Sequence, residues 1–382
     1  MRSKKLILFV ANQAQYFMAH WLRRAQAARA EGYEVHVAVQ DSEAVGKLRE
    51  EGFVVHLIPL QRRGMNPIKE IFSLGALVNL YRKLRPDLVH HLTIKPVLYG
   101  GLAARLTRTP AVVSAITGLG YVFTQHGVFA FLLRKAVTFG YRFAMGHPCI
   151  RVTFENPDDR AQFVKHRLIS ERNSVWIKGA GVDISEFAPT SEHAGPPLVV
   201  LASRLLWDKG VGEFVDSARE LRNAGVSARF VLVGDTDPDN PSGVPREQLE
   251  LWKEKGAVEW WGWRQDIPYV LEQAHIVCLP SYYREGIPRI LIEAAACGRP
   301  IVTTDLPGCR EAVRDGESGL IVPARNVGRL ASALRRLIDD AELRKKMGLC
   351  GRKIAESEFA EAKIIRHTLD VYQELFDQCV AC

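Results

Sequence analysis

The sequence lacks any uninterrupted apolar run of the roughly 20 residues that a membrane-spanning helix needs. Its first apolar stretch, L-I-L-F-V, ends at Asn12 and Gln13 and is too short for a signal peptide. Disulfide patterning is also missing, because the seven cysteines are odd in number and scattered. Cys379 and Cys382 have the spacing of zinc ligands but no second pair. These absences predict a protein of a reducing compartment that does not span a membrane.

A glycine-rich dinucleotide fingerprint is missing as well. The first loop reads A-N-Q-A-Q-Y-F-M-A-H, and no G-x-G-x-x-G follows a predicted strand elsewhere. An NAD-dependent enzyme is therefore disfavoured. The sequence also contains no known nucleic-acid-binding module.

Charge is unevenly distributed along the 382 residues. Residues 1–190 hold 26 Lys and Arg against 14 Asp and Glu, a net charge of +12. Residues 191–382 hold 25 against 29, a net charge of −4. A basic first half beside a mildly acidic second half implies an anionic partner for the first half only. Nucleic acid is one such partner, and anionic lipid or a lipid diphosphate is the other.

Length and periodicity predict two α/β domains. Short apolar strands alternate with helical segments through the first half, which is typical of a doubly wound parallel sheet. Residues 186–198 contain three prolines and no periodicity, so we expect the domain boundary near residue 190.

A strand–loop–helix–strand unit surrounds Glu285. Apolar runs at residues 274–279 and 300–304 have strand length, and a helix is predicted from about Pro288 to Gly298. Ligands bind parallel sheets at the carboxyl ends of strands, where Glu285 lies. Glu293 follows on the helix, and backbone N–H groups between the two acids can hold an anion. Alone, both acids could equally be solvated surface residues.

Arg204 and Lys209 form a second candidate group, in the loop S-R-L-L-W-D-K-G after a predicted strand. Arginine offers a planar fork of donors and lysine a point charge, so the two could converge on one diphosphate. As isolated residues they could be solvated loop charges.

The spacing Glu285-x7-Glu293, with G-I-P after the first acid, closely resembles the E-x7-E motif of retaining glycosyltransferases of family 4. Arg204-x4-Lys209 is similar to the diphosphate-binding pair of that family. The resemblance implies the GT-B fold, an α/β architecture of two Rossmann-like domains facing across a cleft. It implies an acceptor-binding domain at residues 1–190, a nucleotide-sugar-binding domain at 191–358, and a terminal helix at 359–382 that crosses back to the first domain.

The resemblance also implies an activity, which is transfer of a hexose or N-acetylhexosamine from a UDP-sugar with retention of configuration. Glu285, Arg204 and Lys209 would be catalytic, with Glu285 at the donor sugar and Glu293 at the ribose. The other implied donor-binding residues are Gly286, Ile287, Pro288, Arg264 and Gly118. Arg264 would lie beside the nucleotide base, and the neighbouring Trp263 is an alternative for that position.

No metal and no cofactor are expected, because Arg204 and Lys209 already supply positive charge to the diphosphate. Asp235 and Asp237 form a D-x-D pattern, which is the metal–diphosphate signature of the other major glycosyltransferase fold. A proline- and glycine-rich loop follows them, and we interpret the two aspartates as structural.

Segments of the first half look like those of lipid-linked-sugar transferases within family 4. They make His20, His91, Lys95 and Thr117 candidates for the acceptor side. A histidine of H-H-L-T-I-K-P could instead be buried in the sheet and hydrogen-bonded there. We favour this structural role for His90. Many relatives carry a histidine where Thr117 stands, so a catalytic histidine at that place is in doubt.

Residues 128–145 are apolar and aromatic except for cations such as Lys135 and Arg142, seven residues apart. Such a helix could contact anionic lipid headgroups, or it could be a core helix with two solvated cations. The +12 charge favours the membrane surface. We therefore expect a cytoplasmic protein, peripheral on the inner face of the membrane, with a polyprenyl-diphosphate-linked saccharide as acceptor.

Other functions stay open at this point. The chain could be a sugar-nucleotide epimerase of GT-B shape, a transferase acting on a soluble acceptor, or a catalytically silent partner of a transferase. The pattern leaves the donor sugar, the acceptor sugar, the linkage and the glycan pathway (O-antigen, capsule or protein glycan) undetermined.

Overall fold

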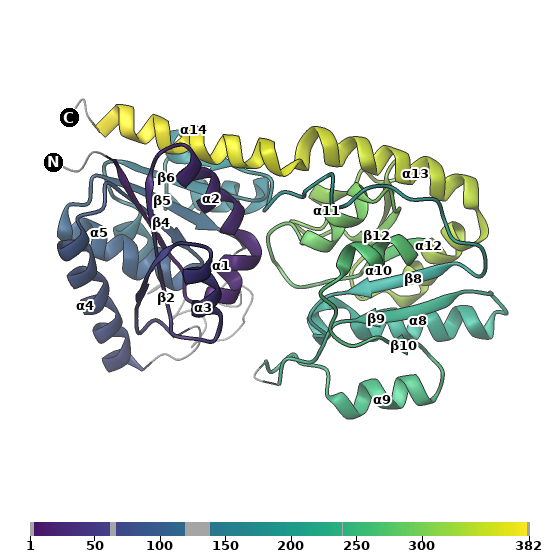
Figure 1. Cartoon of the computed structure of the whole chain (residues 1–382). Coiled ribbons are helices and arrows are strands. Elements are labelled where there is room, and N and C mark those ends of the chain that lie inside the picture. The colour runs from purple at the N-terminus through teal and green to yellow at the C-terminus, as the bar shows by residue number, and fades with distance from the viewer. Residues whose placement is uncertain (1–3, 62–65, 119–137, 239, 380–382) are drawn as a thin grey trace. The chain divides into compact units, whose positions relative to one another are not determined.

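The structure is a computed structural model that describes residues 4–61, 66–118, 138–238 and 240–379. The chain divides into two compact units, each built on one parallel sheet (Figure 1). Unit 1 comprises Met1–Ala180 and Ile364–Cys382, and unit 2 comprises Gly181–Lys363. Among the described helices, none combines the length and apolar character needed to cross a membrane. The predicted α/β class with two doubly wound sheets is confirmed.

Unit 1 holds a seven-stranded sheet in the order β3-β2-β1-β4-β5-β6-β7. Its strands are β1 (Leu6–Val10), β2 (Glu34–Val39), β3 (Val54–Leu57), β4 (Leu88–Leu92), β5 (Ala111–Ile116), β6 (Ile150–Phe154) and β7 (Ser174–Trp176). The chain order reverses between β1 and β4, which makes their carboxyl ends the expected ligand site.

Two layers of helices cover the two faces of this sheet. One layer consists of α1 (Ala14–His20), α2 (Leu22–Ala30), α3 (Ala44–Glu50) and α14 (Glu361–Cys379). The other consists of α4 (Pro67–Leu84), η1 (Pro96–Gly100), α5 (Gly101–Thr107), the helical residues 138–144 and α7 (Pro157–Lys165). A short turn, η3 (Glu171–Asn173), precedes β7. Alternate residues of β1 enter the two cores, so Phe9 packs in the first layer and Leu8 in the second.

Two consecutive histidines of β4 lie inside unit 1, one on each face of the sheet. His90 Nδ1 is 2.6 Å from the hydroxyl of Tyr372 on α14. His91 Nε2 is 2.9 Å from the hydroxyl of Tyr81 on α4, and its Nδ1 is 3.4 Å from Ser114 Oγ. Both imidazoles are fully buried. The structure therefore gives His91 a structural role in place of the predicted acceptor contact, because no part of its ring reaches the surface.

Unit 2 holds a six-stranded sheet in the order β10-β9-β8-β11-β12-β13. Its strands are β8 (Leu198–Ala202), β9 (Arg229–Val233), β10 (Glu259–Trp260), β11 (Ile276–Leu279), β12 (Ile301–Thr304) and β13 (Gly319–Val322). The order reverses between β8 and β11. The loop with Arg204 and Lys209 follows β8, and the loop with Glu285 follows β11, so these loops flank the reversal point.

Helices again cover both faces of the sheet. One core contains residues of α10 (Ile267–Gln273), α11 (Arg289–Ala296) and η6 (Ala355–Phe359). The other contains residues of α8 (Val211–Asn223), α9 (Arg246–Glu254), α12 (Val327–Asp339) and α13 (Ala341–Ile354). Two short turns, η4 (Trp207–Lys209) and η5 (Arg310–Ala312), lie in the loops after β8 and β12.

The structure places the boundary between the units at Gly181, earlier than the predicted position near residue 190. Three contacts explain the difference. Val182 bridges to Ala360, the Phe187 side chain is buried in a core of unit 2, and Glu192 pairs with Arg344 at 2.8 Å. The proline-containing stretch is therefore attached to unit 2, although it has no helix or strand. The terminal helix joins unit 1 from Ile364 onward.

Four cysteines, Cys278, Cys297, Cys309 and Cys350, are free, whereas Cys149 is disulfide-bonded. The scattered spacing of the cysteines did not predict this bond, because it gives no information about which residues meet in space.

We expect acid to destabilise unit 1 through its buried histidines. Burial lowers the pKa of His91 to about 3. Between about pH 3 and 6.5 the unfolded chain binds a proton that the folded chain does not, so stability is present above pH 6.5 and falls on acidification. The slope approaches about 1.4 kcal/mol per pH unit for one histidine. In His91→Gln, which keeps a hydrogen-bonding group for Tyr81, the melting temperature should fall less between pH 7 and pH 5.

The matched control is His367→Gln, which alters an exposed histidine on α14. It should reproduce the pH dependence of the wild-type melting temperature. An unchanged pH dependence in a folded His91→Gln protein would contradict the buried, neutral state of His91.

Candidate functional site

Close backbone packing holds three loops together at the carboxyl end of the unit 2 sheet. Gly210 has φ 76°, and a Cβ there would lie 2.2 Å from the carbonyl oxygen of Pro280, after β11. Gly308, after β12, has φ 85°, and a Cβ there would lie 2.1 Å from the carbonyl oxygen of Gly286. Only glycine fits such positions. The loops after β8, β11 and β12 thus touch each other through their main chains.

An ion pair between Lys209 and Glu285 lies at the centre of this group. The Lys209 ammonium contacts Glu285 Oε1, and the side chains are 8% and 20% exposed. Ser281 Oγ is 3.4 Å from the same carboxylate oxygen, and the Tyr283 ring centroid is 5.8 Å from Lys209 Nζ. The structure therefore brings together two residues that are 76 positions apart in the sequence, as the predicted diphosphate site requires.

Arg204 lies in the same β8 loop but is much more accessible, with 46% of its side chain exposed. Its guanidinium donates to Asp237 Oδ2 at 3.0 Å. Asp235 lies 3.9 Å from Arg246. In the described part of the chain, no group of three or more His, Cys, Asp or Glu residues could hold a metal ion. The two aspartates of the D-x-D pattern thus pair with arginines here.

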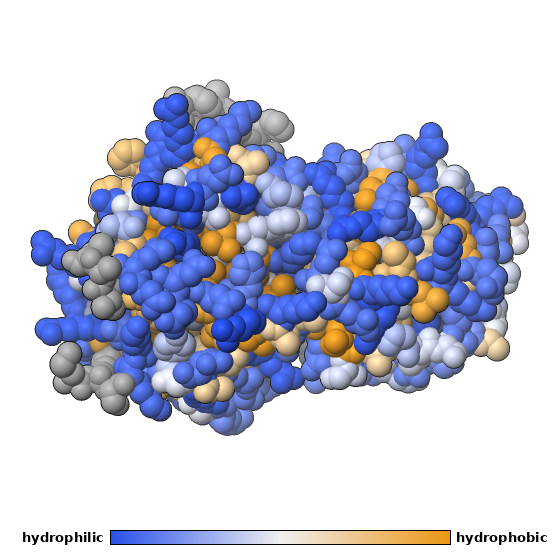
Figure 2. Space-filling view, turned by 90° about the horizontal axis from the view of Figure 1, so that it is seen from above, coloured by the Kyte–Doolittle hydropathy of each residue, from blue (hydrophilic) through white to orange (hydrophobic). Residues whose placement is uncertain are grey.

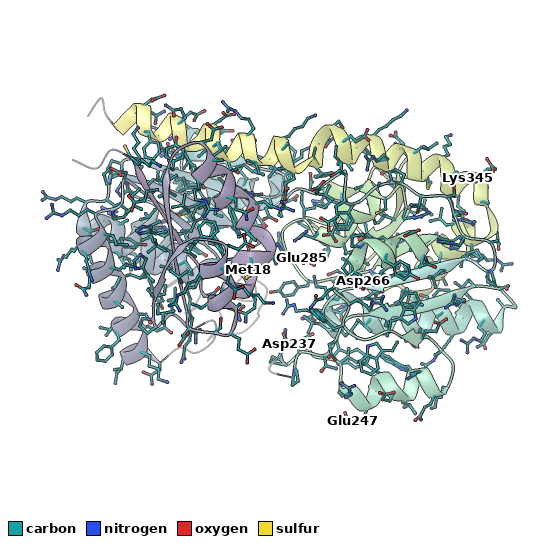
Figure 3. The ribbon with its side chains drawn as sticks, in the orientation of Figure 1. Met18, Asp237, Glu247, Asp266, Glu285 and Lys345 are labelled. Carbon is teal, nitrogen blue, oxygen red and sulfur yellow. The ribbon has the colours of Figure 1, made fainter. Side chains whose placement is uncertain are left out.

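The loop that carries Asp237 is attached to the β8 loop by backbone hydrogen bonds. Leu205 N donates to Asp235 O, Val244 N to Leu205 O, and Trp207 N to Ser242 O, over 2.7–3.0 Å. Arg204 is thus held by the backbone hydrogen bonds of its loop and by the contact between its guanidinium and Asp237. Figure 3 shows Glu285 and Asp237 toward the same end of unit 2, with Lys345 toward the other.

Glu293, the second acid of the motif, lies on α11 and is 6% exposed. Arg289, one turn earlier, pairs with it at 2.9 Å. Burial raises the pKa of the Glu293 carboxyl above its ordinary value, although Arg289 acts in the opposite direction. Pro288 is the N-cap residue of α11, so the helix begins one residue later than predicted.

Gly286 to Pro288 form the connection from Glu285 to this helix. The Ile287 side chain is buried in a core of unit 2, which leaves its main chain as the part that a ligand could contact. Lys209, Glu285 and the start of α11 therefore form one contiguous group of side-chain and backbone atoms.

Arg264 lies in different surroundings. Its guanidinium forms two hydrogen bonds with Asp266, at 2.7 and 2.5 Å. It lines a cavity of about 530 Å³ together with residues that begin strands β8 and β9, namely Leu198 and Arg229. The contacts of Arg264 thus give it no link to Lys209 or Glu285, and a role at the nucleotide base stays a prediction.

In unit 1, His20 and Thr117 come together through Tyr16. The Tyr16 hydroxyl donates to Thr117 Oγ1 at 3.3 Å, and its ring lies 4.7 Å from that of His20. Burial, reinforced by the charge of Glu155, raises the pKa of Tyr16 to about 12. Gly118, next in the chain, has φ 126°, which only glycine adopts readily. These residues lie at the carboxyl ends of β1 and β5.

Sequence reasoning overlooked Tyr16. The only signal was its place in Y-F-M-A-H, one helical turn before His20.

Lys95 precedes η1 and forms an ion pair with Glu70 of α4 at 2.6 Å, each side chain 17% exposed. Its charge is thus already balanced inside unit 1, and contact with an acceptor stays a prediction. Arg142 is exposed, and its guanidinium donates to the carbonyl oxygen of His166. Lys135, the other predicted membrane-contact residue, lies outside the described residues.

Comparison with known proteins agrees with this geometry. Residues 196–340 match the family described as glycosyl transferases group 1, and residues 6–145 match the glycosyl transferase 4-like family. The chain is similar to the N,N'-diacetylbacillosaminyl-diphospho-undecaprenol alpha-1,3-N-acetylgalactosaminyltransferase of Campylobacter jejuni, with 32% identity over 81% of this chain and 83% of that protein.

Two further similarities extend over most of the chain. The UDP-Gal:alpha-D-GlcNAc-diphosphoundecaprenol alpha-1,3-galactosyltransferase of Escherichia coli is 24% identical over 90% of each chain. The crystal structure of Anabaena HepE in complex with UDP has a TM-score of 0.77 and 19% identity, and the match covers 97% of this chain and 100% of that one. The chain therefore belongs to the group 1 glycosyltransferases with a family 4-like amino-terminal half, and it is a glycosyltransferase with the GT-B fold.

Proposed function

We propose that this glycosyltransferase moves a hexose or N-acetylhexosamine from a UDP-sugar, with retention of configuration, to a polyprenyl-diphosphate-linked saccharide in the synthesis of a surface glycan. The observation that carries the proposal is the meeting of Lys209, Glu285 and the start of α11 at the reversal point of the unit 2 sheet. This arrangement supplies positive charge and backbone donors for a diphosphate, with a carboxylate beside them for sugar hydroxyls.

The relatives support the acceptor class. The names of the Campylobacter jejuni and Escherichia coli proteins both describe saccharides linked to diphosphoundecaprenol. The bound UDP in the HepE structure supports the nucleotide part of the donor. Since identity to these proteins is 32% or lower, the particular donor sugar and linkage are not transferred to this chain.

The chemical role of the site follows from where charge develops. When the bond between the sugar and the nucleoside diphosphate breaks, negative charge grows on the β-phosphate. Lys209, Arg204 and the backbone N–H groups after Glu285 would stabilise this charge from fixed positions. Neither Glu285 nor Glu293 is assigned as a nucleophile, in keeping with front-face attack, in which the donor phosphate accepts the proton of the acceptor hydroxyl. Glu285 would orient the donor sugar, and Glu293 the ribose.

A peripheral position on the cytoplasmic face of the membrane is part of the same proposal. A polyprenyl-linked acceptor is confined to a bilayer, so the enzyme must work at its surface. The basic first half and the exposed apolar side chains Ile68, Ile71 and Phe72 on α4 suit an anionic lipid surface. The +12 charge of residues 1–190 would hold the protein there reversibly.

The first prediction concerns the diphosphate clamp. Lys209→Ala should remove a charge-assisted contact to the leaving group. The loss of about 2–4 kcal/mol of transition-state stabilisation should lower kcat/KM by roughly 30-fold to 10³-fold. Lys345→Ala, at the other end of unit 2 in Figure 3, is the matched control and should keep wild-type activity. Circular dichroism and melting temperature check the fold. Near-normal kcat/KM in a folded Lys209→Ala protein would refute the assignment.

Metal independence is the second prediction. Turnover should persist in EDTA, because Arg204 and Lys209 take the place of a divalent ion, and Asp237 is already paired with Arg204. The measurement is the initial rate with and without EDTA, followed by addition of Mg²⁺ or Mn²⁺. Loss of activity that either ion restores would make Asp235 and Asp237 metal ligands.

The acceptor class is tested by a screen of UDP-sugars against two forms of the same saccharide, one linked to polyprenyl diphosphate and one free, with products identified by mass spectrometry. We expect transfer to the lipid-linked form and much weaker transfer to the free one. Equal transfer to both would favour a soluble acceptor. Interconversion of the UDP-sugar without transfer would instead indicate an epimerase.

A further inference from the structure

The two helical layers of unit 1 hold equal numbers of cations but different numbers of acids. The layer of α4, η1, α5, residues 138–144 and α7 has seven Lys and Arg against three Asp and Glu, two of them in the first turn of α7, whereas α1, α2, α3 and α14 have seven against five. In α4, η1, α5 and residues 138–144 the one acidic residue is Glu70, which is paired with Lys95. The same segments carry the cations Lys69, Arg82, Lys83, Arg105 and Arg142. The opposite layer includes α14, which alone contributes Glu361, Asp370, Glu374 and Asp377. We refer to α4, η1, α5, residues 138–144 and α7 as the basic layer.

Large apolar side chains are exposed on the same layer. They are Ile68, Ile71, Phe72, Leu106, Phe139 and Phe143, with exposed fractions from 42% to 73%. Within the described residues, no large apolar side chain of α1, α2, α3 or α14 is exposed. Figure 2, which looks down on α14, shows mostly hydrophilic side chains around that helix. Exposed aromatic residues among cations are typical of a surface that contacts a bilayer.

A cavity of about 600 Å³ opens in the basic layer, between the ends of the 138–144 helix and of α7. Three arginines line it, Arg142, Arg167 and Arg172, and no acidic residue does. Buried apolar side chains that line it include Met145, Leu168 and Ile169. We call it the arginine cavity. It lies beside the residues that precede β6 and β7, so it is at the end of the sheet opposite to Tyr16 and Thr117.

Structural roles account for only part of this charge. Arg142 donates to the carbonyl oxygen of His166, and Arg105 donates to that of Phe143, so both satisfy carbonyl groups at helix ends. Within the described part of the chain, the side chains of Arg167 and Arg172 form no ion pair or hydrogen bond. Two exposed guanidinium groups at one apolar-floored cavity repel each other, and an anion would relieve that repulsion.

Two exposed aromatic side chains lie on the short helix that supplies Arg142 to this cavity. Phe139 precedes Arg142 by three residues and Phe143 by four, so these three side chains share one side of the short helix. Phe139 is 73% exposed and Phe143 42% exposed. An anion bound at the cavity would thus have apolar surface next to it, which suits an amphiphile better than a free ion.

We propose that the arginine cavity binds the phosphate group of an anionic phospholipid, with Phe139 and Phe143 entering the adjoining bilayer interface. This inference rests on the proposed action at a membrane, and it assigns a lipid site separate from the donor site in unit 2. Guanidinium groups recognise phosphate oxygens through paired N–H donors. The site would fix which side of unit 1 faces the lipid, beyond the general attraction of a basic protein to a negative surface.

The test compares two double variants of the full chain that remove the same charge from unit 1. Arg167→Gln/Arg172→Gln alters the arginine cavity, and Arg82→Gln/Lys83→Gln alters the exposed end of α4. Binding is measured by flotation with phosphatidylcholine vesicles that contain or lack phosphatidylglycerol. Diffuse attraction weakens binding by roughly five-fold per lost cation. The cavity variant should lose at least ten-fold more affinity for phosphatidylglycerol vesicles than the α4 variant.

Equal losses in the two variants would overturn the site in favour of diffuse charge. Failure of the wild-type protein to float on phosphatidylglycerol vesicles, or equal flotation on phosphatidylcholine alone, would also overturn it. Inorganic phosphate that displaces the wild-type protein from vesicles more strongly than chloride of equal ionic strength would assign the cavity to free phosphate instead.

Transferase activity separates this inference from the proposed function. On an acceptor dispersed in detergent, both variants should retain wild-type turnover, since neither alters the donor site. A wild-type protein that floats as expected but transfers sugar to no lipid-linked acceptor would refute the proposed function and leave the lipid site standing.

Discussion

The contact between Lys209 and Glu285 is the interaction on which the rest of unit 2 depends for its function. Each residue follows a strand at the reversal point of the sheet. The contact is possible because Gly210 and Gly308 let the loop backbones approach to distances that a Cβ would prevent. A buried lysine with no partner would be costly, so Glu285 also holds Lys209 in place.

The two cations of the clamp differ in how easily they can exchange partners. Arg204 is about half exposed, and a solvent-screened pair such as Arg204–Asp237 is worth about 1 kcal/mol or less. In the proposed site, a diphosphate would therefore replace Asp237 at little cost. Lys209 is 8% exposed, so losing Glu285 entirely would cost more. An ammonium group has three donors, however, and one can stay on Glu285 while the others turn to phosphate. This division makes Lys209 the fixed member and Arg204 the adaptable one.

The sequence predicted the meeting of Lys209 and Glu285 better than it predicted the surroundings of His91 and Lys95, for a physical reason. E-x7-E and R-x4-K are local spacings on a loop and a helix start, and local geometry alone places their residues at strand ends. His91 depends instead on which face of β4 meets Tyr81, a contact set by packing of α4 that no local pattern records. Lys95 likewise met Glu70, a partner 25 residues away. The structural interpretation of Asp237 agrees with its pairing to Arg204, although that partner could not be foreseen.

The proposed function places two different requirements on the surface of unit 1. The carboxyl ends of β1 and β5 hold a polar group, Tyr16, His20 and Thr117, suited to sugar hydroxyls. The basic layer exposes aromatic and aliphatic side chains that would promote aggregation if they faced water without charge around them. The polar group lies at the carboxyl end of the sheet, and the exposed apolar side chains lie on the helices that cover one face. One domain can therefore carry both. Residues 88–154 contain no Asp or Glu, which agrees with the proposed contact with a negative surface, since an acid there would weaken the attraction.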